Sequence, residues 1–308
     1  ISSLEELHLA VQSQLPVAGL GFLNGMSNLK LLDISGNWMT DLNGIQFVPG
    51  LEVLELSFNH FMRLNETESA ALLTGMTNLK EFYYTGFGGQ SLGFIQNMPQ
   101  LEILVLTDKF QIDDAEMTLI GSLANLRELW LRDIRVKMDI SHLGGLSNLR
   151  KLWIASSDID GATLAFPATL VSLTEIELLD AFDSQYDFGD SRGDVKSSYA
   201  VFRDLPTLTE LHMIRPWLND PADVTLNANL TSLSMVAAKL DNLDFFADVT
   251  GIRRLDLSRN PFTELDPLAT MPDLAELVLD DSAVSCAELD EFRTAVPNVS
   301  VTTNLFCQ

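Results

Sequence analysis

The sequence predicts an elongated α/β repeat fold in which short parallel strands stack into one continuous sheet. Three observations predict it. The pattern L-x-x-L-x-L recurs at intervals of 22 to 35 residues, with other large apolar residues at some leucine positions. A second phrase, of the type Gly-Met-Ser-Asn or Met-Pro-Gln, leads into the pattern in several units. The chain has 308 residues, of which 46% are hydrophobic, and this is enough for a long shared core.

The recurring pattern defines about twelve repeats that cover residues 4–298. In each repeat, the alternation of apolar residues predicts a short strand with its leucines on one side. A single strand of this kind cannot bury its apolar side, so neighbouring repeats must stack. The repeats begin at Leu4, Leu29, Leu51, Leu79, Leu101, Leu126, Leu149, Leu173, Leu208, Leu230, Ile252 and Leu274, and a shorter echo begins at Val299.

The segments that return from one strand to the next are short. Most 22-residue repeats have no room for a full helix, so we expect 3₁₀ or extended returns. The longer repeats predict helices at 69–73 and 115–123, the first preceded by capping residues. After Cys286 the apolar residues have helical spacing, which predicts a helical cap over the C-terminal end of the core.

Two segments, Leu255–Phe262 and Leu32–Asn37, carry the pattern L-x-L-x-x-N, with which the sequence resembles the leucine-rich repeat family. The 22-residue repeats are most similar to the bacterial internalin-like class. The resemblance spans almost the whole chain. It implies a curved α/β solenoid with a parallel sheet on the concave face and mostly 3₁₀ or extended returns on the convex face. We expect one domain over 1–308, with a C-terminal cap at 283–308.

The asparagine of the family pattern stands at Asn37, Asn59 and Asn260 in this sequence. In the family this side chain hydrogen-bonds backbone inside the turn. Other repeats have a different residue at the equivalent position, so we expect less regular turns there: Phe87, Ser157, Ala181 and Ala238.

The C-terminal segment is similar to the caps of bacterial leucine-rich proteins, which implies a disulfide between Cys286 and Cys307. Such a bond would close a loop of about 20 residues and stabilise the fold by ~3 kcal/mol in the chain-entropy model. The alternative is two buried free thiols. A disulfide would indicate an oxidising compartment. We therefore expect an extracellular or cell-surface protein, with its export signal and any anchor outside this chain.

The fifth position of L-x-x-L-x-L points away from the core and holds large side chains in four consecutive repeats. Three strand spacings make this row about 14 Å long, and Trp and Tyr are enriched at interface hot spots. Residues 127–151 also form a locally basic span, with six basic and three acidic residues. The candidate partner-binding residues are therefore Tyr83, Val105, Trp130, Trp153, Arg132 and Lys151. The alternative is that these aromatic side chains only cover one another and that the cations balance nearby acids.

Composition restricts the partners. The chain has 43 acidic and 19 basic residues, a net charge of −24, which disfavours nucleic acid and anionic lipid. No apolar run approaches the ~18 residues of a membrane span. With two Cys and four His, we expect no zinc or iron–sulfur site and no cofactor. The acidic surface raises a second possibility, a basic partner against Glu175, Glu177, Asp180 and Glu210.

The predicted function is non-enzymatic binding of a protein, or of a glycan, since Trp also stacks on sugars. The alternative is a recognition or scaffold domain of a larger receptor or intracellular effector. Two motifs are weaker. Ser91 lies in a G-x-S-x-G sequence, the nucleophile motif of hydrolases, but its position in a return segment favours a glycine-rich turn. The carboxylates of the 183–194 loop are a candidate weak calcium site, against the simpler interpretation of a solvated loop.

Overall fold

The computed structural model describes residues 2–11, 19–59, 71–85, 92–107, 112–134, 138–157, 159, 165–180, 199–216 and 227–307. The chain forms two compact units, which are described separately below. The first comprises Ile1–Trp153 with Ser157–Ile159, and the second comprises Ile154–Ser156 with Asp160–Gln308. A single domain over 1–308 stays a prediction.

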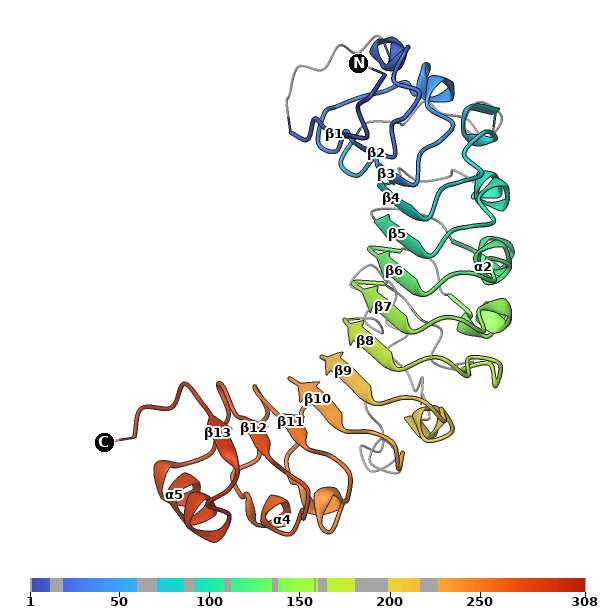
Figure 1. Ribbon diagram of the computed structural model, residues 1–308. Coiled ribbons are helices and arrows are strands. Elements are labelled where there is room, and N and C mark those ends of the chain that lie inside the picture. The colour runs from blue at the N-terminus through green and yellow to red at the C-terminus, as the bar shows by residue number, and fades with distance from the viewer. Residues whose placement is uncertain are drawn as a thin grey trace, which may run out of the picture. The chain divides into compact units, whose positions relative to one another are not determined.

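Among the described residues, thirteen strands follow one another in chain order in a parallel sheet (Figure 1), as the repeat pattern predicts. The last strand is the echo at Val299. The strands are β1 (Glu6–His8), β2 (Leu31–Asp33), β3 (Val53–Glu55), β4 (Glu81–Thr85), β5 (Ile103–Thr107), β6 (Glu128–Arg132), β7 (Lys151–Ala155), β8 (Glu175–Leu179), β9 (Glu210–Ile214), β10 (Ser232–Val236), β11 (Arg254–Asp256), β12 (Glu276–Val278) and β13 (Ser300–Thr302).

The repeat leucines form the core. In the first unit Leu32 is in register with Leu54, and in the second Leu233 is in register with Leu255. Leucines at the same repeat position therefore lie next to one another, and those of the central strands, Leu104, Leu129 and Leu152, are fully buried. This confirms the leucine-rich-repeat solenoid that the sequence predicts.

The return segments lie on the other side of the core from the strands (Figure 1) and are mostly 3₁₀ turns, as expected from repeat length. The 3₁₀ segments are Gly21–Leu23, Ile45–Phe47, Gly93–Asn97, Ile140–Gly145, Tyr199–Phe202 and Asp244–Phe246. The α-helices include α2 (Asp114–Gly121), α4 (Asp266–Ala269) and α5 (Cys286–Ala295). The helix predicted at 115–123 is thus confirmed as α2. Residues 71–73 are helical, and the start of that predicted helix lies outside the described residues.

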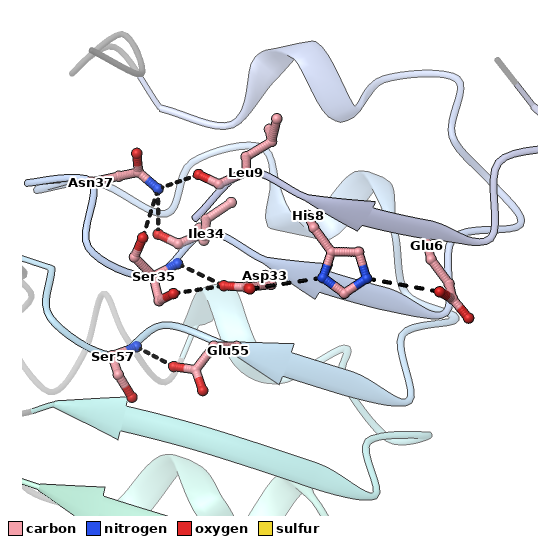
Figure 2. Close-up of polar contacts among 9 residues, drawn as sticks. All are labelled: Glu6, His8, Leu9, Asp33, Ile34, Ser35, Asn37, Glu55 and Ser57. Carbon is pink, nitrogen blue, oxygen red and sulfur yellow. Dashed lines mark hydrogen bonds and ion pairs between the residues drawn. The ribbon is translucent and has the colours of Figure 1, made fainter. Parts of the chain in front are cut away.

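Asparagine side chains connect the turns of adjacent repeats. The Asn37 amide nitrogen donates to the carbonyl oxygens of Leu9, Ile34 and Ser35 at 2.7–3.0 Å (Figure 2). Asn260 makes equivalent bonds to carbonyl oxygens of its own and the preceding repeat. The polar atoms of these turns are therefore satisfied inside the core, as burial requires.

The described turns that lack this asparagine, at Ser157 and Ala238, are more regular than expected, while Phe87 and Ala181 lie outside the described residues. The eighth residue of every described repeat has a left-handed backbone, including Ser156 and Ala237, with φ of 46° and 53°. Their amides donate to the carbonyls of Leu179 and Ser258 in the next repeat, at 2.8 and 2.9 Å. Backbone hydrogen bonds between repeats therefore fix the turn even where the asparagine is absent.

The C-terminal end of the second unit is closed by a cap. Helix α5 begins after Ser285, whose hydroxyl accepts a hydrogen bond from the Glu288 amide. The helix buries Leu289 and Phe292 against the last repeats, and β13 pairs with β12. A disulfide joins Cys286 at the start of α5 to Cys307, with their Cα atoms 5.5 Å apart.

Candidate partner-binding surface

The four predicted fifth-position residues lie side by side on the solvent face of the first unit. Tyr83, Val105 and Trp130 are directly in register on β4, β5 and β6. The ring of Trp153 on β7 follows, with its centroid 5.1 Å from that of Trp130. All four side chains are half-buried. We call these four residues the aromatic row.

The Trp130 ring is held in place by three side chains. Its indole N–H donates to a carboxylate oxygen of Glu128 at 3.1 Å. The Lys151 ammonium nitrogen lies 4.7 Å from the ring centroid, in cation–π range. The Trp153 ring lies against it at an angle of 39°. This part of the row is preorganised, which lowers the ordering cost of binding.

Tyr83 is fixed in the same way at the other end of the row. Its hydroxyl donates to a carboxylate oxygen of Glu81 at 2.9 Å. Desolvation raises the pKa of the Tyr83 phenol above its usual value, and the Glu81 carboxylate raises it further. The phenol therefore stays protonated and acts as a hydrogen-bond donor throughout the physiological pH range.

The cations around the row are partly neutralised. The Arg132 side chain is exposed and lies 3.3 Å from the Asp133 carboxylate. Arg127 lies 3.4 Å from Glu102. Exposed pairs of this kind contribute little to stability, so these cations can still interact with a partner.

The acidic alternative lies in the second unit. Glu175 on β8 is paired in register with Glu210 on β9, and Glu177 on β8 is paired with His212 on β9. His212 lies 3.6 Å from Glu210, and Asp180 forms an ion pair with Arg215. The Arg215 pairing offsets the charge of Asp180, which weakens this group as a docking site for a basic partner.

The histidines do not form a metal site within the described residues, where no group of three potential ligands occurs. His8 lies between Glu6 and Asp33, at 3.8 Å from each (Figure 2). His142 contacts Thr118 at 3.1 Å and lies near Asp114 and Asp139. Each of these histidines thus has nearby polar partners from its own or the adjacent repeat.

Strands β2 and β3 carry acidic side chains at the position where β4, β6 and β7 carry aromatic ones. The Asp33 carboxylate accepts hydrogen bonds from the Ser35 amide and hydroxyl, and Glu55 accepts one from the Ser57 amide (Figure 2). Desolvation raises the pKa of Glu55, partly opposed by its bonds to Ser57. These carboxylates therefore both fix the strand exits and make this end of the face acidic.

Two sequence motifs fall outside the described residues. These are Ser91 of the G-x-S-x-G motif and the 183–194 loop with its candidate calcium ligands. The basic span is described except for residues 135–137. Among the described segments, no helix is both long and apolar enough to cross a membrane.

One surface feature was not predicted from the sequence. Val11, Trp38 and Phe58 are large, apolar and exposed, at or near the turns that follow the first three strands. Reading the eighth position of each repeat, as the fifth was read, would have identified Val11 and Phe58. Trp38 lies two residues beyond that position.

Comparison with solved structures places the fold among leucine-rich-repeat proteins, internalins included. A leucine-rich-repeat protein of Leptospira interrogans is 21% identical with a TM-score of 0.69, over 98% of this chain and 72% of that one. An internalin (inlF) from Listeria monocytogenes is 18% identical with a TM-score of 0.66, over 100% and 88% of the two chains.

A third similar structure is TLR13 in its complex with ssRNA13, at 17% identity and a TM-score of 0.64. This chain is covered to 98% and spans half of the TLR13 chain. No protein-family model matches the sequence, and a search of curated proteins gives no match. At these identities the likeness concerns the fold alone.

Proposed function

We propose that this protein is a non-enzymatic interaction module that binds a protein partner through the aromatic row together with Arg132 and Lys151. The main support for this proposal is that the residues of the aromatic row are contiguous on the sheet. Three aromatic side chains and one valine, from four adjacent strands, stand on the solvent face of the sheet. Aromatic groups concentrated in this way are typical of binding sites and supply hot-spot energy.

The surroundings of Trp130 favour a protein over a glycan. A sugar that stacks on an indole needs an open ring face, but Lys151 and Trp153 already contact this ring. The span 127–151 has a net charge of +3, from six basic and three acidic residues. A partner that presents apolar and acidic side chains would complement the row best.

Nucleic acid is a poorer candidate. TLR13 is in complex with ssRNA13, so the fold is compatible with such a ligand. This chain, however, has a net charge of −24, which opposes approach of a polyanion. The basic span is short and its cations are partly paired, which leaves little positive surface for phosphates.

For location, we propose a bacterial secreted or cell-surface protein. The Cys286–Cys307 disulfide supports an oxidising compartment. The likeness to an internalin supports the same interpretation. The alternative, a recognition domain of a larger receptor, is supported by the TLR13 comparison, in which this chain spans half of the longer protein.

The test is the double substitution Trp130→Ala with Trp153→Ala. Surface proteins captured by the unmodified chain are identified, and their affinities are measured with both forms. We expect at least a 10-fold loss of affinity with little change in melting temperature. His212→Ala, at the equivalent strand position in the second unit, is the control and should bind normally. A large loss of stability in the double variant would assign the tryptophans a structural role instead.

A further inference from the structure

Three large apolar side chains of the first unit are exposed just beyond its first strands. Val11, Trp38 and Phe58 keep 74%, 61% and 69% of their surface accessible. Val11 and Phe58 occupy the eighth position of the first and third repeats, and Trp38 lies two residues beyond that position in the second. We call these three residues the apolar edge.

The eighth residues of the first three repeats, Val11, Gly36 and Phe58, belong to one surface, and Trp38 follows Gly36 by two residues. The Val11 amide donates to the Ser35 carbonyl at 2.8 Å, and the Gly36 amide donates to the Ser57 carbonyl at 2.9 Å. A Cβ atom at Gly36 would lie 3.2 Å from a Val11 methyl group. The eighth residues thus follow one another at strand spacing, which places Val11 and Phe58 about 10 Å apart.

Folding does not account for apolar residues at these positions. Val11, Trp38 and Phe58 have φ of 54°, 58° and 57°, a left-handed conformation that is strained for such side chains. Polar or small residues occupy the eighth position in the described later repeats, namely Asp133, Ser156, Asp180, Arg215, Ala237, Arg259 and Asp281. The apolar edge is therefore both strained and solvated, a combination that indicates a role in binding.

The charge next to the apolar edge defines its partner. Residues 1–59 contain six carboxylates and one lysine, a net charge of −5. Asp33 and Glu55 stand on β2 and β3 (Figure 2), and in the sequence they precede Gly36 and Phe58 by three residues. The single lysine of this stretch, Lys30, is paired with Glu52 at 3.2 Å. A partner covering the apolar edge would meet a strongly negative surface beside it.

We propose that the apolar edge is a second interaction surface, which binds a protein segment with apolar side chains flanked by lysine or arginine. This surface differs in chemistry from the aromatic row, where the local charge is positive. Val11, Trp38 and Phe58 supply the apolar contact, and the nearby carboxylates, Asp33 and Glu55 among them, select the basic flanks.

The test uses an 18-residue amphipathic peptide of Leu and Lys as the probe, with a Leu and Glu peptide for comparison. The variant is Val11→Asn with Phe58→Asn. Asn tolerates the left-handed conformation, and the substitution leaves the net charge unchanged. The control is Ala237→Asn, at the same repeat position in the second unit, with φ of 53°.

We expect the Leu and Lys peptide to bind the unmodified chain and the control equally, and the double variant at least 10-fold more weakly. The melting temperature of the double variant should not fall. The Trp130→Ala, Trp153→Ala form should bind this peptide normally, which separates this surface from the aromatic row.

Several results would overturn the proposal. They are no binding by the unmodified chain, equal affinity in the double variant, or equally tight binding of the Leu and Glu peptide. Sedimentation equilibrium tests whether a second copy of this protein occupies the apolar edge instead. A dimer of the unmodified chain that dissociates in the double variant would assign the apolar edge to contact between two copies of this protein.

Discussion

At the scale of single residues, the buried Asn59 side chain connects the backbones of two adjacent repeats through hydrogen bonds. Its side chain is completely buried. The amide nitrogen donates to the carbonyls of Ile34 and Leu56, at 2.8 and 3.1 Å, and the oxygen accepts from the amides of Asn37 and Met39, at 3.1 and 3.0 Å. One side chain thus satisfies four backbone groups from two adjacent repeats.

Replacing Asn59 with Ala should lower the free energy of unfolding by about 3 kcal/mol, because several buried backbone groups lose their partner. Urea denaturation followed by circular dichroism measures the change. The matched control is Asn43→Ala, since that side chain is exposed and bonds only to Asp41 nearby. The control should cost less than about 1 kcal/mol. Equal effects of the two substitutions would contradict this role for Asn59.

At the scale of elements, two return segments, α2 and the 3₁₀ segment Ile140–Gly145, approach one another closely. A Cβ atom at Gly121 would lie 2.1 Å from the His142 carbonyl oxygen. A Cβ atom at Gly145 would lie 2.1 Å from the Gly121 carbonyl oxygen. Two glycines therefore allow these segments to stack at the spacing set by the strands.

Gly145→Ala should destabilise the first unit by about 2 kcal/mol, because the added methyl group meets backbone that cannot move aside. Gly75 is a matched comparison, since it stands in the same phrase before its repeat and a Cβ atom added there would have no neighbour within 4 Å. Gly75→Ala should change stability by less than about 1 kcal/mol. Thermal and urea denaturation of the two variants under the same conditions measures the difference between their stabilities.

At the scale of the whole molecule, each repeat contacts mainly its neighbours. A substitution should therefore destabilise its own repeat and the adjacent ones more than distant repeats. The C-terminal cap is the clearest case. Helix α5 and β13 cover the last repeats, and the Cys286–Cys307 disulfide ties the end of the chain to the start of α5.

Replacing Cys286 and Cys307 with Ala should destabilise the cap by ~3 kcal/mol. Hydrogen exchange with mass spectrometry should show lost protection in β12, α5 and β13 and unchanged protection in β4 to β6. Binding through the aromatic row should persist, because it belongs to the other unit. Lost protection throughout the first unit would show that the repeats are coupled far more strongly than near-neighbour contacts allow.

Sequence patterns predicted the repeats well because residues at the same repeat position lie on the same side of the sheet in each repeat. Leu104, Leu129 and Leu152 had to be buried, and Tyr83, Val105, Trp130 and Trp153 had to share the opposite face, once the strands were in register. The expectation of irregular turns at Ser157 and Ala238 was wrong for a physical reason. Backbone hydrogen bonds between repeats are present in turns with and without the asparagine, and such bonds leave no residue signature.

The repeat register, the core and the side of the sheet on which each residue stands could therefore be predicted from the residue pattern, because alternation along a strand is a local property. The contacts that those residues make with one another follow only from the tertiary structure. Lys151 over the Trp130 ring, the Trp153 ring against the Trp130 ring, and the exposure of Val11, Trp38 and Phe58 depend on distances between neighbouring side chains and on turn conformation. Those quantities arise only when the repeats stack, since no single repeat contains both partners of a contact between strands.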